Sequence, residues 1–163
     1  MSDLVDSTNQ NFTEYKFGDM VNGLYDFWRK ELADVYLEAI KPVMKSENQA
    51  NKNAALNTLY LCLDQALKLL HPTMPYLTEE LYQRLPHPAA LRSESICIAK
   101  FPQNLNLAFE GVKENMDKTL LTVKAIRSQL AALNVASNAK PTIFLQTENP
   151  ELRAVFQQEQ AVI

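Results

Sequence analysis

Residues 54–70 form a segment that is apolar around almost its whole circumference, and it most restricts what the chain can fold into. Twelve of its seventeen residues are Ala, Leu, Tyr or Cys. A helix of this composition has no wide polar face to turn toward water, so other helices must cover it. The sequence therefore predicts a bundle with a buried central helix from about residue 50 to 70, and with Cys62 as a core residue without a redox role.

Glycine is scarce, which agrees with a helical fold. The chain of 163 residues holds three glycines, isolated from one another in the sequence. Neither GxGxxG nor GxxxxGK(S/T) occurs, so the glycine-rich loops that hold nucleotide phosphates in Rossmann and P-loop proteins are absent. The sequence therefore argues against a nucleotide enzyme of either class.

Three further segments have helical periodicity. From Phe17 to Pro42, apolar residues recur mostly at spacings of three and four, and the proline is expected to end the helix. A short helix is expected from Thr78, as its N-cap, to Leu85, and a long helix over about 105–133. The stripe of the first helix consists of Met20, Leu24, Phe27, Trp28, Leu32, Val35, Tyr36 and Ile40.

The remaining segments set the expected domain organisation. Residues 1–16 are polar and are expected to be a flexible N-terminal segment. Residues 17–135 are expected to form an all-α, antiparallel helical bundle. Residues 136–163 are expected to begin a small α/β unit, with a strand at 141–147 and a helix from Pro150. This strand-helix remnant would be incomplete, because one strand and one helix cannot form a stable layer.

The few cysteines and histidines exclude several kinds of site. Two of each are present, without the spacing of a zinc site or a disulfide framework. His71 is expected to face free carbonyl groups at a helix end, and Cys97 to pack on one side of an extended segment. His87 has no visible partner. No nucleophile, base and orienting group can be assembled, so no catalytic residue, cofactor site or metal ligand is predicted.

Charge and hydropathy restrict the partners and the compartment. The formal net charge is −3, so bulk positive charge alone cannot carry nucleic-acid binding. No apolar stretch approaches the roughly 20 residues needed to cross a bilayer, and the first residues lack the apolar core of a signal peptide. We therefore expect a cytoplasmic protein without a membrane partner.

Two long segments resemble the anticodon-binding domain of class I aminoacyl-tRNA synthetases for branched aliphatic amino acids. Residues 27–42 (FWRKELADVYLEAIKP) resemble a signature helix of that domain. Residues 67–85 resemble its LLHPxMPFxTEELWQ segment, with Tyr76 and Tyr82 in place of Phe and Trp. With shorter matches at 95–102, interpreted as extended, and at 123–128, the resemblance covers about residues 17–147. Synthetases of the valyl type in the eukaryotic cytosol look most similar, and the isoleucyl and leucyl types are the alternatives.

The resemblance implies a parent enzyme that attaches valine to its tRNA with cleavage of ATP. The HIGH and KMSKS signatures that handle ATP in that family do not occur here. We therefore expect an excised fragment that is not an enzyme by itself and binds no cofactor, with ATP used by the parent. Its expected partners are tRNA and the catalytic domain of the parent.

Polar and basic residues near expected helix ends are the candidate tRNA contacts. Proteins read an anticodon loop through stacking and hydrogen bonds to splayed bases, with Lys and Arg on the phosphates. A purely structural role in the parent, or a free-standing helical interaction module with an apolar surface at 161–163, remains an alternative. The candidate contacts are Arg29, Lys30, Lys45, Asn51, Lys52 and Asn53.

Overall fold

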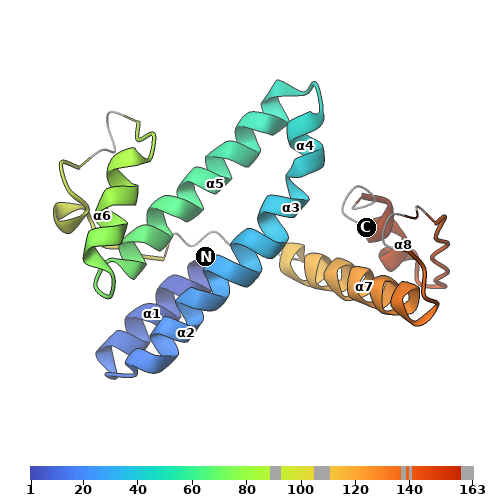
Figure 1. Cartoon of the computed structure of the whole chain (residues 1–163), viewed down its shortest axis with the longest axis horizontal. Coiled ribbons are helices and arrows are strands. Elements are labelled where there is room, and N and C mark those ends of the chain that lie inside the picture. The colour runs from blue at the N-terminus through green and yellow to red at the C-terminus, as the bar shows by residue number, and fades with distance from the viewer. Residues whose placement is uncertain (89–92, 105–110, 137–138, 140, 159–163) are drawn as a thin grey trace. The chain divides into compact units, whose positions relative to one another are not determined.

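A computed structural model describes residues 1–88, 93–104, 111–136, 139 and 141–158. Every regular element within these ranges is helical, which confirms the predicted all-α class. The chain divides into two compact units, Met1–Leu107 and Ala108–Ile163, which we describe separately (Figure 1). The unit boundary lies before the long helix that the sequence assigned to the bundle, so the predicted bundle of 17–135 is split between the two units.

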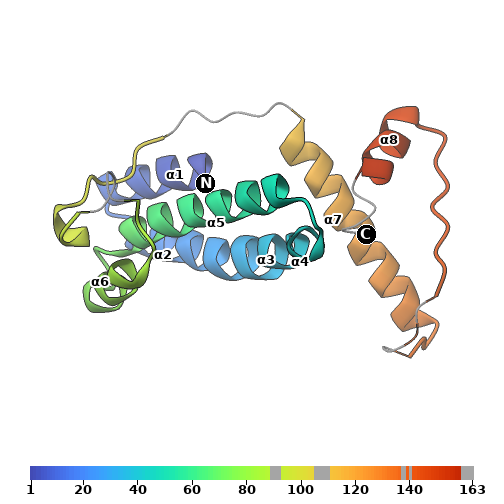
Figure 2. The same cartoon turned by 90° about the horizontal axis from the view of Figure 1, so that it is seen from above.

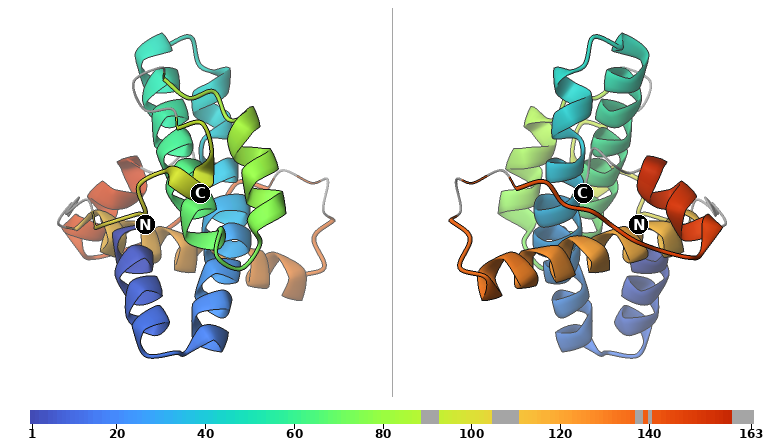
Figure 3. Two further views of the ribbon diagram at one scale, coloured as in Figure 1. Left: turned by 90° about the vertical axis from the view of Figure 1, so that its left-hand side faces the viewer. Right: turned by 90° about the vertical axis from the view of Figure 1, so that its right-hand side faces the viewer.

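The first unit begins with a helical hairpin of α1 (Ser2–Thr13) and α2 (Phe17–Asp26). Figure 3 shows the two helices side by side, joined by a short turn. Val5 on α1 is 2% exposed and packs against Met20, Leu24 and Leu69. The prediction of a flexible segment at 1–16 is therefore wrong. One narrow apolar stripe suffices to hold an otherwise polar helix against its neighbours.

The hairpin continues into a nearly continuous helical segment that reaches residue 45. After α2 it consists of η1 (Phe27–Tyr36), α3 (Leu37–Ala39) and α4 (Lys41–Lys45). η1 is a π-helix, with hydrogen bonds to the fifth preceding residue, and the Leu37 N–H that follows it donates to the Leu32 carbonyl. Pro42 does not end the helix as predicted. It lies in the first turn of α4, where its missing N–H costs no hydrogen bond.

Helix α5 (Gln49–Leu70) runs back alongside this segment (Figure 2). Its buried residues all lie between 64 and 69, and none of residues 49–58 is buried. The prediction of a central helix covered along its whole length is therefore correct for the second half of α5 and wrong for the first half. The two halves differ in what lies beside them, because the second half has further elements packed against it.

Those further elements are α6 (Pro75–Arg84) and the short 3-10 helix η2 (Ile96–Ile98). Tyr82 and Ile96 form a buried cluster with Leu67 of α5. α6 begins one turn before the predicted Thr78 cap, with Pro75 in its first turn. Thr78 is instead fully buried inside the helix. Residues 96–98 form a 3-10 turn where an extended segment was predicted, and its buried residue is Ile96.

The second unit contains α7 (Val112–Ala132) and α8 (Pro150–Gln158). The end of the predicted helix 105–133 is confirmed, while its start at 105–110 lies outside the described residues. The strand predicted at 141–147 does not form in the structure, because no second strand in the described part of the chain pairs with it. The apolar end at 161–163 also lies outside the described residues. No described helix is long and apolar enough to span a bilayer.

Candidate nucleic-acid interface

The turn between α4 and α5 brings four of the six candidate residues to one end of the first unit. Helix α4 is closed by Ser46, whose N–H donates to the Pro42 carbonyl and whose hydroxyl donates to the Val43 carbonyl at 2.7 Å. Helix α5 is capped by Asn48, whose side-chain oxygen accepts the N–H of Asn51 at 3.1 Å. The turn is therefore held on both sides by side-chain hydrogen bonds, so the residues it presents have defined positions.

Lys45 and Lys52 are the two cations at this turn. Neither has an ion pair or hydrogen-bond partner for its ammonium group within the described ranges. Lys41, one turn before Lys45, is paired with Glu38 at 2.6 Å. Lys45 and Lys52 thus differ from the paired lysines by keeping their donors available to an outside anion.

The first turn of α5 adds backbone donors to the same place. Gln49 and the residues of the first helical turn after it include no acid, although Glu47 lies just before the Asn48 cap. The N-terminus of a helix carries a partial positive charge. Such a helix end is suited to phosphate, because the Gln49 and Ala50 N–H groups lack intrahelical partners, while that of Asn51 is used by the Asn48 cap. The α4–α5 turn therefore combines two lysine ammonium groups with a helix N-terminus.

Asn51 and Asn53 lie in this first turn of α5 and are both exposed. The Asn53 side-chain oxygen accepts a hydrogen bond from Gln49 Nε2 at 2.9 Å, which leaves its NH2 group as a donor. The Asn51 side-chain amide has no partner among the residues that the structure describes, so it offers both a donor and an acceptor. Amide groups of this kind match the edges of unpaired bases.

Arg29 and Lys30 do not join this group. They lie on η1, and Lys30 is separated from Lys45 by fifteen residues, which is roughly 20 Å along a helix. Lys30 is paired with Asp26 at 2.8 Å. The structure therefore places the six candidates in two groups, and the second group has one cation already engaged.

Tyr25 is a neighbour of Arg29 that the sequence analysis missed. Its ring is 53% exposed, the Arg29 Nη1 donates to its hydroxyl at 2.5 Å, and the guanidinium lies 5.9 Å from the ring centre. This hydrogen bond is the main cause that raises the pKa of Arg29. An exposed ring beside a guanidinium is a surface on which a base can stack. The available signal was the spacing of four residues between an aromatic and a cation in a predicted helix.

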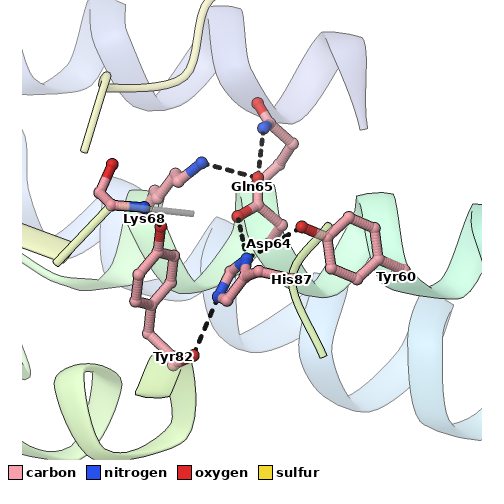
Figure 4. A network of polar contacts seen from close by, with 7 residues as sticks. Tyr60, Asp64, Gln65, Lys68, Tyr82 and His87 are labelled. Atoms are coloured by element: carbon pink, nitrogen blue, oxygen red, sulfur yellow. Dashed lines mark hydrogen bonds and ion pairs between the residues drawn. The ribbon is translucent and has the colours of Figure 1, made fainter. Parts of the chain in front are cut away.

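A network of polar side chains holds the other half of α5 in place (Figure 4). Asp64 accepts hydrogen bonds from Lys68 at 2.7 Å and from Gln65 at 2.9 Å. His87, with a side chain only 1% exposed, contacts the Tyr82 carbonyl through Nε2 and the Tyr60 hydroxyl through Nδ1, both at 2.9 Å. A carbonyl only accepts, so Nε2 carries the proton and Nδ1 accepts from Tyr60 in the neutral ring. His87 thus has partners that the sequence did not reveal.

This network joins α5 to α6 and to the segment after α6, and its polar groups are used within the protein. Asp64 Oδ1 lies 4.0 Å from His87 Nδ1, and the Lys68 ammonium lies 5.9 Å from the Tyr82 ring centre. Buried polar groups with their partners in place give rigidity to the elements they connect. Among the described residues, no three His, Cys, Asp or Glu side chains are grouped so that they could hold a metal ion.

Comparison with known proteins gives a consistent match. The family described as anticodon-binding domain of tRNA ligase matches residues 1–146. The valine–tRNA ligase of Homo sapiens is 36% identical over 148 residues, which covers 90% of this chain and 12% of that protein. The mitochondrial valine–tRNA ligase 1 of Arabidopsis thaliana is 40% identical over 134 residues, which covers 79% of this chain and 12% of that protein. The valine–tRNA ligase of Bacillus licheniformis is 28% identical over 165 residues, which covers 100% of this chain and 18% of that protein. The chain therefore spans less than a fifth of the length of these relatives.

Proposed function

Because the chain belongs to the family of anticodon-binding domains of tRNA ligases, we propose that it binds the anticodon arm of a valine tRNA through the α4–α5 turn. The observation that carries the proposal is the pair of ammonium groups of Lys45 and Lys52 at the N-terminus of α5, which have no partner in the described part of the chain. The choice of valine is supported by the printed names of the relatives. None of these three relatives is named for isoleucine or leucine.

In this proposal the binding task is divided between phosphates and bases. Lys45, Lys52 and the first N–H groups of α5 take the phosphates, which positions the RNA without reading its sequence. The side-chain amides of Asn51 and Asn53 contact base edges, and the ring of Tyr25 with Arg29 provides a second, separate stacking place. In this arrangement the chain contributes recognition, and the chemistry of ligation belongs to another part of the parent protein.

The parent in this proposal is a valine–tRNA ligase that uses ATP to join valine to its tRNA and works in the cytoplasm. The chain alone is expected to catalyse neither aminoacylation nor pyrophosphate exchange. Both cysteines are free thiols, which fits a reducing compartment. Because one relative is named mitochondrial, imaging of the tagged parent protein is the direct test of the compartment.

A salt-dependent titration of the chain with tRNA tests the binding face. We expect a preference for valine tRNA over a tRNA for another amino acid. We also expect that the Lys45→Ala/Lys52→Ala double variant weakens binding by about ten- to a hundredfold and lowers the salt slope by about 1.5, since two phosphate contacts are lost. Its free energy of unfolding should stay within about 0.5 kcal/mol of the parent chain, because both side chains are at the surface.

A matched double variant separates the turn from overall charge. Lys16→Ala/Arg84→Ala removes two cations as well, but these are paired with Glu14 and Glu80 on other helix ends. This control should bind tRNA nearly as the unaltered chain does. If both double variants lose affinity equally, binding depends on total charge, and the α4–α5 turn is not the interface.

A further inference from the structure

A second group of side chains, which combines a histidine with a thiol, lies where α5 ends. It plays no part in the proposed tRNA contacts. His71 follows α5 directly, Thr78 is on α6 and Cys97 is on η2. His71 Nδ1 lies 2.7 Å from the Thr78 hydroxyl oxygen, and His71 Nε2 lies 3.2 Å from the Cys97 sulfur. His71 therefore stands between a buried hydroxyl and an exposed thiol, not against free helix carbonyls as the sequence suggested.

The hydrogen-bond partners decide which ring nitrogen carries the proton. The Thr78 hydroxyl has one hydrogen, which it donates to the Met74 carbonyl at 2.9 Å, with the Pro75 carbonyl as its other acceptor at 3.2 Å. Its oxygen must then accept from His71, so Nδ1 carries the hydrogen. In the neutral ring Nε2 is left as an acceptor, and the Cys97 thiol is the donor that faces it. Thr78 therefore orients the imidazole as a base toward Cys97.

The backbone around Cys97 is fixed while its sulfur stays accessible. The Cys97 N–H donates to the Ser95 hydroxyl oxygen at 3.1 Å, and the Ser95 hydroxyl donates to Glu79 Oε2 at 2.7 Å. Glu79 also accepts the N–H of Ile96, whose side chain is 4% exposed in the core. A group attached to the Cys97 sulfur would therefore extend toward solvent without removing Ile96 from its packing.

Glu79 of α6 is a charged group that is linked to Cys97 through the Ser95 hydroxyl. Hydrogen bonds from Gln83 and then from Ser95 are the largest causes that lower the pKa of Glu79. Glu79 therefore stays a carboxylate that accepts from the Ser95 hydroxyl and holds Ser95 against the Cys97 N–H.

Cys62 provides an internal contrast. It packs beside the buried cluster of Phe27, Leu32 and Ala66, and burial raises the pKa of its thiol. The structure gives it no histidine partner among the described residues. The two thiols of one chain thus differ in both exposure and access to a base, which are the two properties that control thiol reactivity.

We propose that Cys97 is a modification site that forms a mixed disulfide with low-molecular-weight disulfides such as oxidised glutathione, with His71 as the base. The thiol proton moves to His71 Nε2 while the sulfur attacks one sulfur of the disulfide. The new S–S bond forms as the old one breaks, and the departing thiolate takes the proton from His71 Nε2. One thiol and one disulfide are consumed, and one mixed disulfide and one thiol are produced.

The first experiment needs no variant. The 163-residue chain is incubated with oxidised glutathione at pH 7, natively and in urea, and the modification of each cysteine is followed by peptide mass spectrometry. We expect Cys97 to react at least about tenfold faster in the native than in the unfolded chain, since only the native chain supplies the base. Cys62 should show the opposite order. A native rate for Cys97 at or below its unfolded rate overturns the proposal.

The second experiment isolates the base. His71→Gln keeps a polar side chain but cannot take the proton, so we expect the rate at Cys97 to fall about tenfold at pH 7. The difference should shrink as the pH rises, because hydroxide in solution then removes thiol protons without the imidazole. His87→Gln removes the other imidazole and should leave the rate at Cys97 unchanged. Equal rates for the chain and His71→Gln at pH 7 overturn the role of His71.

Discussion

The two halves of α5 differ both in composition and in surroundings, since residues 49–59 include two leucines and residues 60–70 include five. Leu56 in the first half is 44% exposed, whereas Leu67 and Leu69 in the second half are 3% and 0% exposed. The second half packs against α2, η1, α6 and η2. In the first half the long-range contact is with the segment before α5, for example the Tyr36 hydroxyl donating to the Ala55 carbonyl at 2.8 Å.

Because of this difference, we expect substitutions in the two halves of α5 to affect different properties of the chain. The second half is the place where the core and the polar network meet, so its side chains hold the unit together. The first half leaves one face exposed and begins at the α4–α5 turn, where Lys45 and Lys52 have no ion-pair partner among the described residues. Changes in the second half should therefore act mainly on folding, and changes at the turn mainly on RNA binding.

The largest effect is expected from the same substitution placed in each half. Leu69→Ala should lower the free energy of unfolding by about 2–5 kcal/mol, because it leaves a cavity in a closed core. Leu56→Ala is the matched control and should cost less than about 1 kcal/mol, because its side chain is largely in water already. Urea unfolding followed by circular dichroism measures both. Equal losses would show that the two halves are covered alike in solution.

A smaller effect is expected at the start of the open half. Asn48→Ala removes the side-chain acceptor of the Asn51 N–H and should cost about 1 kcal/mol. Asn48→Ser keeps a capping oxygen and should retain most of the stability. If the turn needs this cap to present Lys45 and Lys52, tRNA affinity should fall in Asn48→Ala and recover in Asn48→Ser. Unchanged affinity in both variants would separate the cap from the binding face.

The smallest effect is expected from alkaline pH. Burial raises the pKa of Cys62 above 9.0 and of Tyr36 and Tyr60 above 10.0. The unfolded chain loses these protons first, so the stabilisation is complete below about pH 8 and is lost as the pH rises through the higher folded values. The effect is modest because these groups are only partly buried and solvent screens them. In Cys62→Ala the decline between pH 8 and 10 should be shallower, and an unchanged decline would remove Cys62 from this account.

The helical parts of the fold follow from local patterns that can be read in one segment at a time. The apolar stripe that begins at Phe17 predicted a helix that extends, in the structure, to Lys45. The segment LLHPTMPYLTEELYQ indicated the family that the comparisons confirm. The π-type hydrogen bonding of η1 had no such signal in the spacing of its residues.

The candidate interface was predictable in part. Polar residues between two predicted helices pointed to Lys45 and Lys52, and the structure brings them to one turn. That Lys30 is engaged by Asp26, and that Tyr25 lies under Arg29, depend on side-chain directions within the helix. The contact of His71 with Cys97 joins residues 26 positions apart, and no local pattern anticipates a contact of that kind.

By itself, the sequence determined that this chain is helical, where most of its helices lie and to which family it belongs, because hydrophobic periodicity and turn residues act over a few neighbouring positions. The tertiary structure alone decided which part of the apolar segment 54–70 is covered, because burial depends on elements distant in the chain. It also placed a helix within the polar segment 1–16 against the core, and among the residues that the structure describes it gave 141–147 no partner strand. For the same reason it decided that the second half of α5 is buried in the core while its first half stays largely exposed.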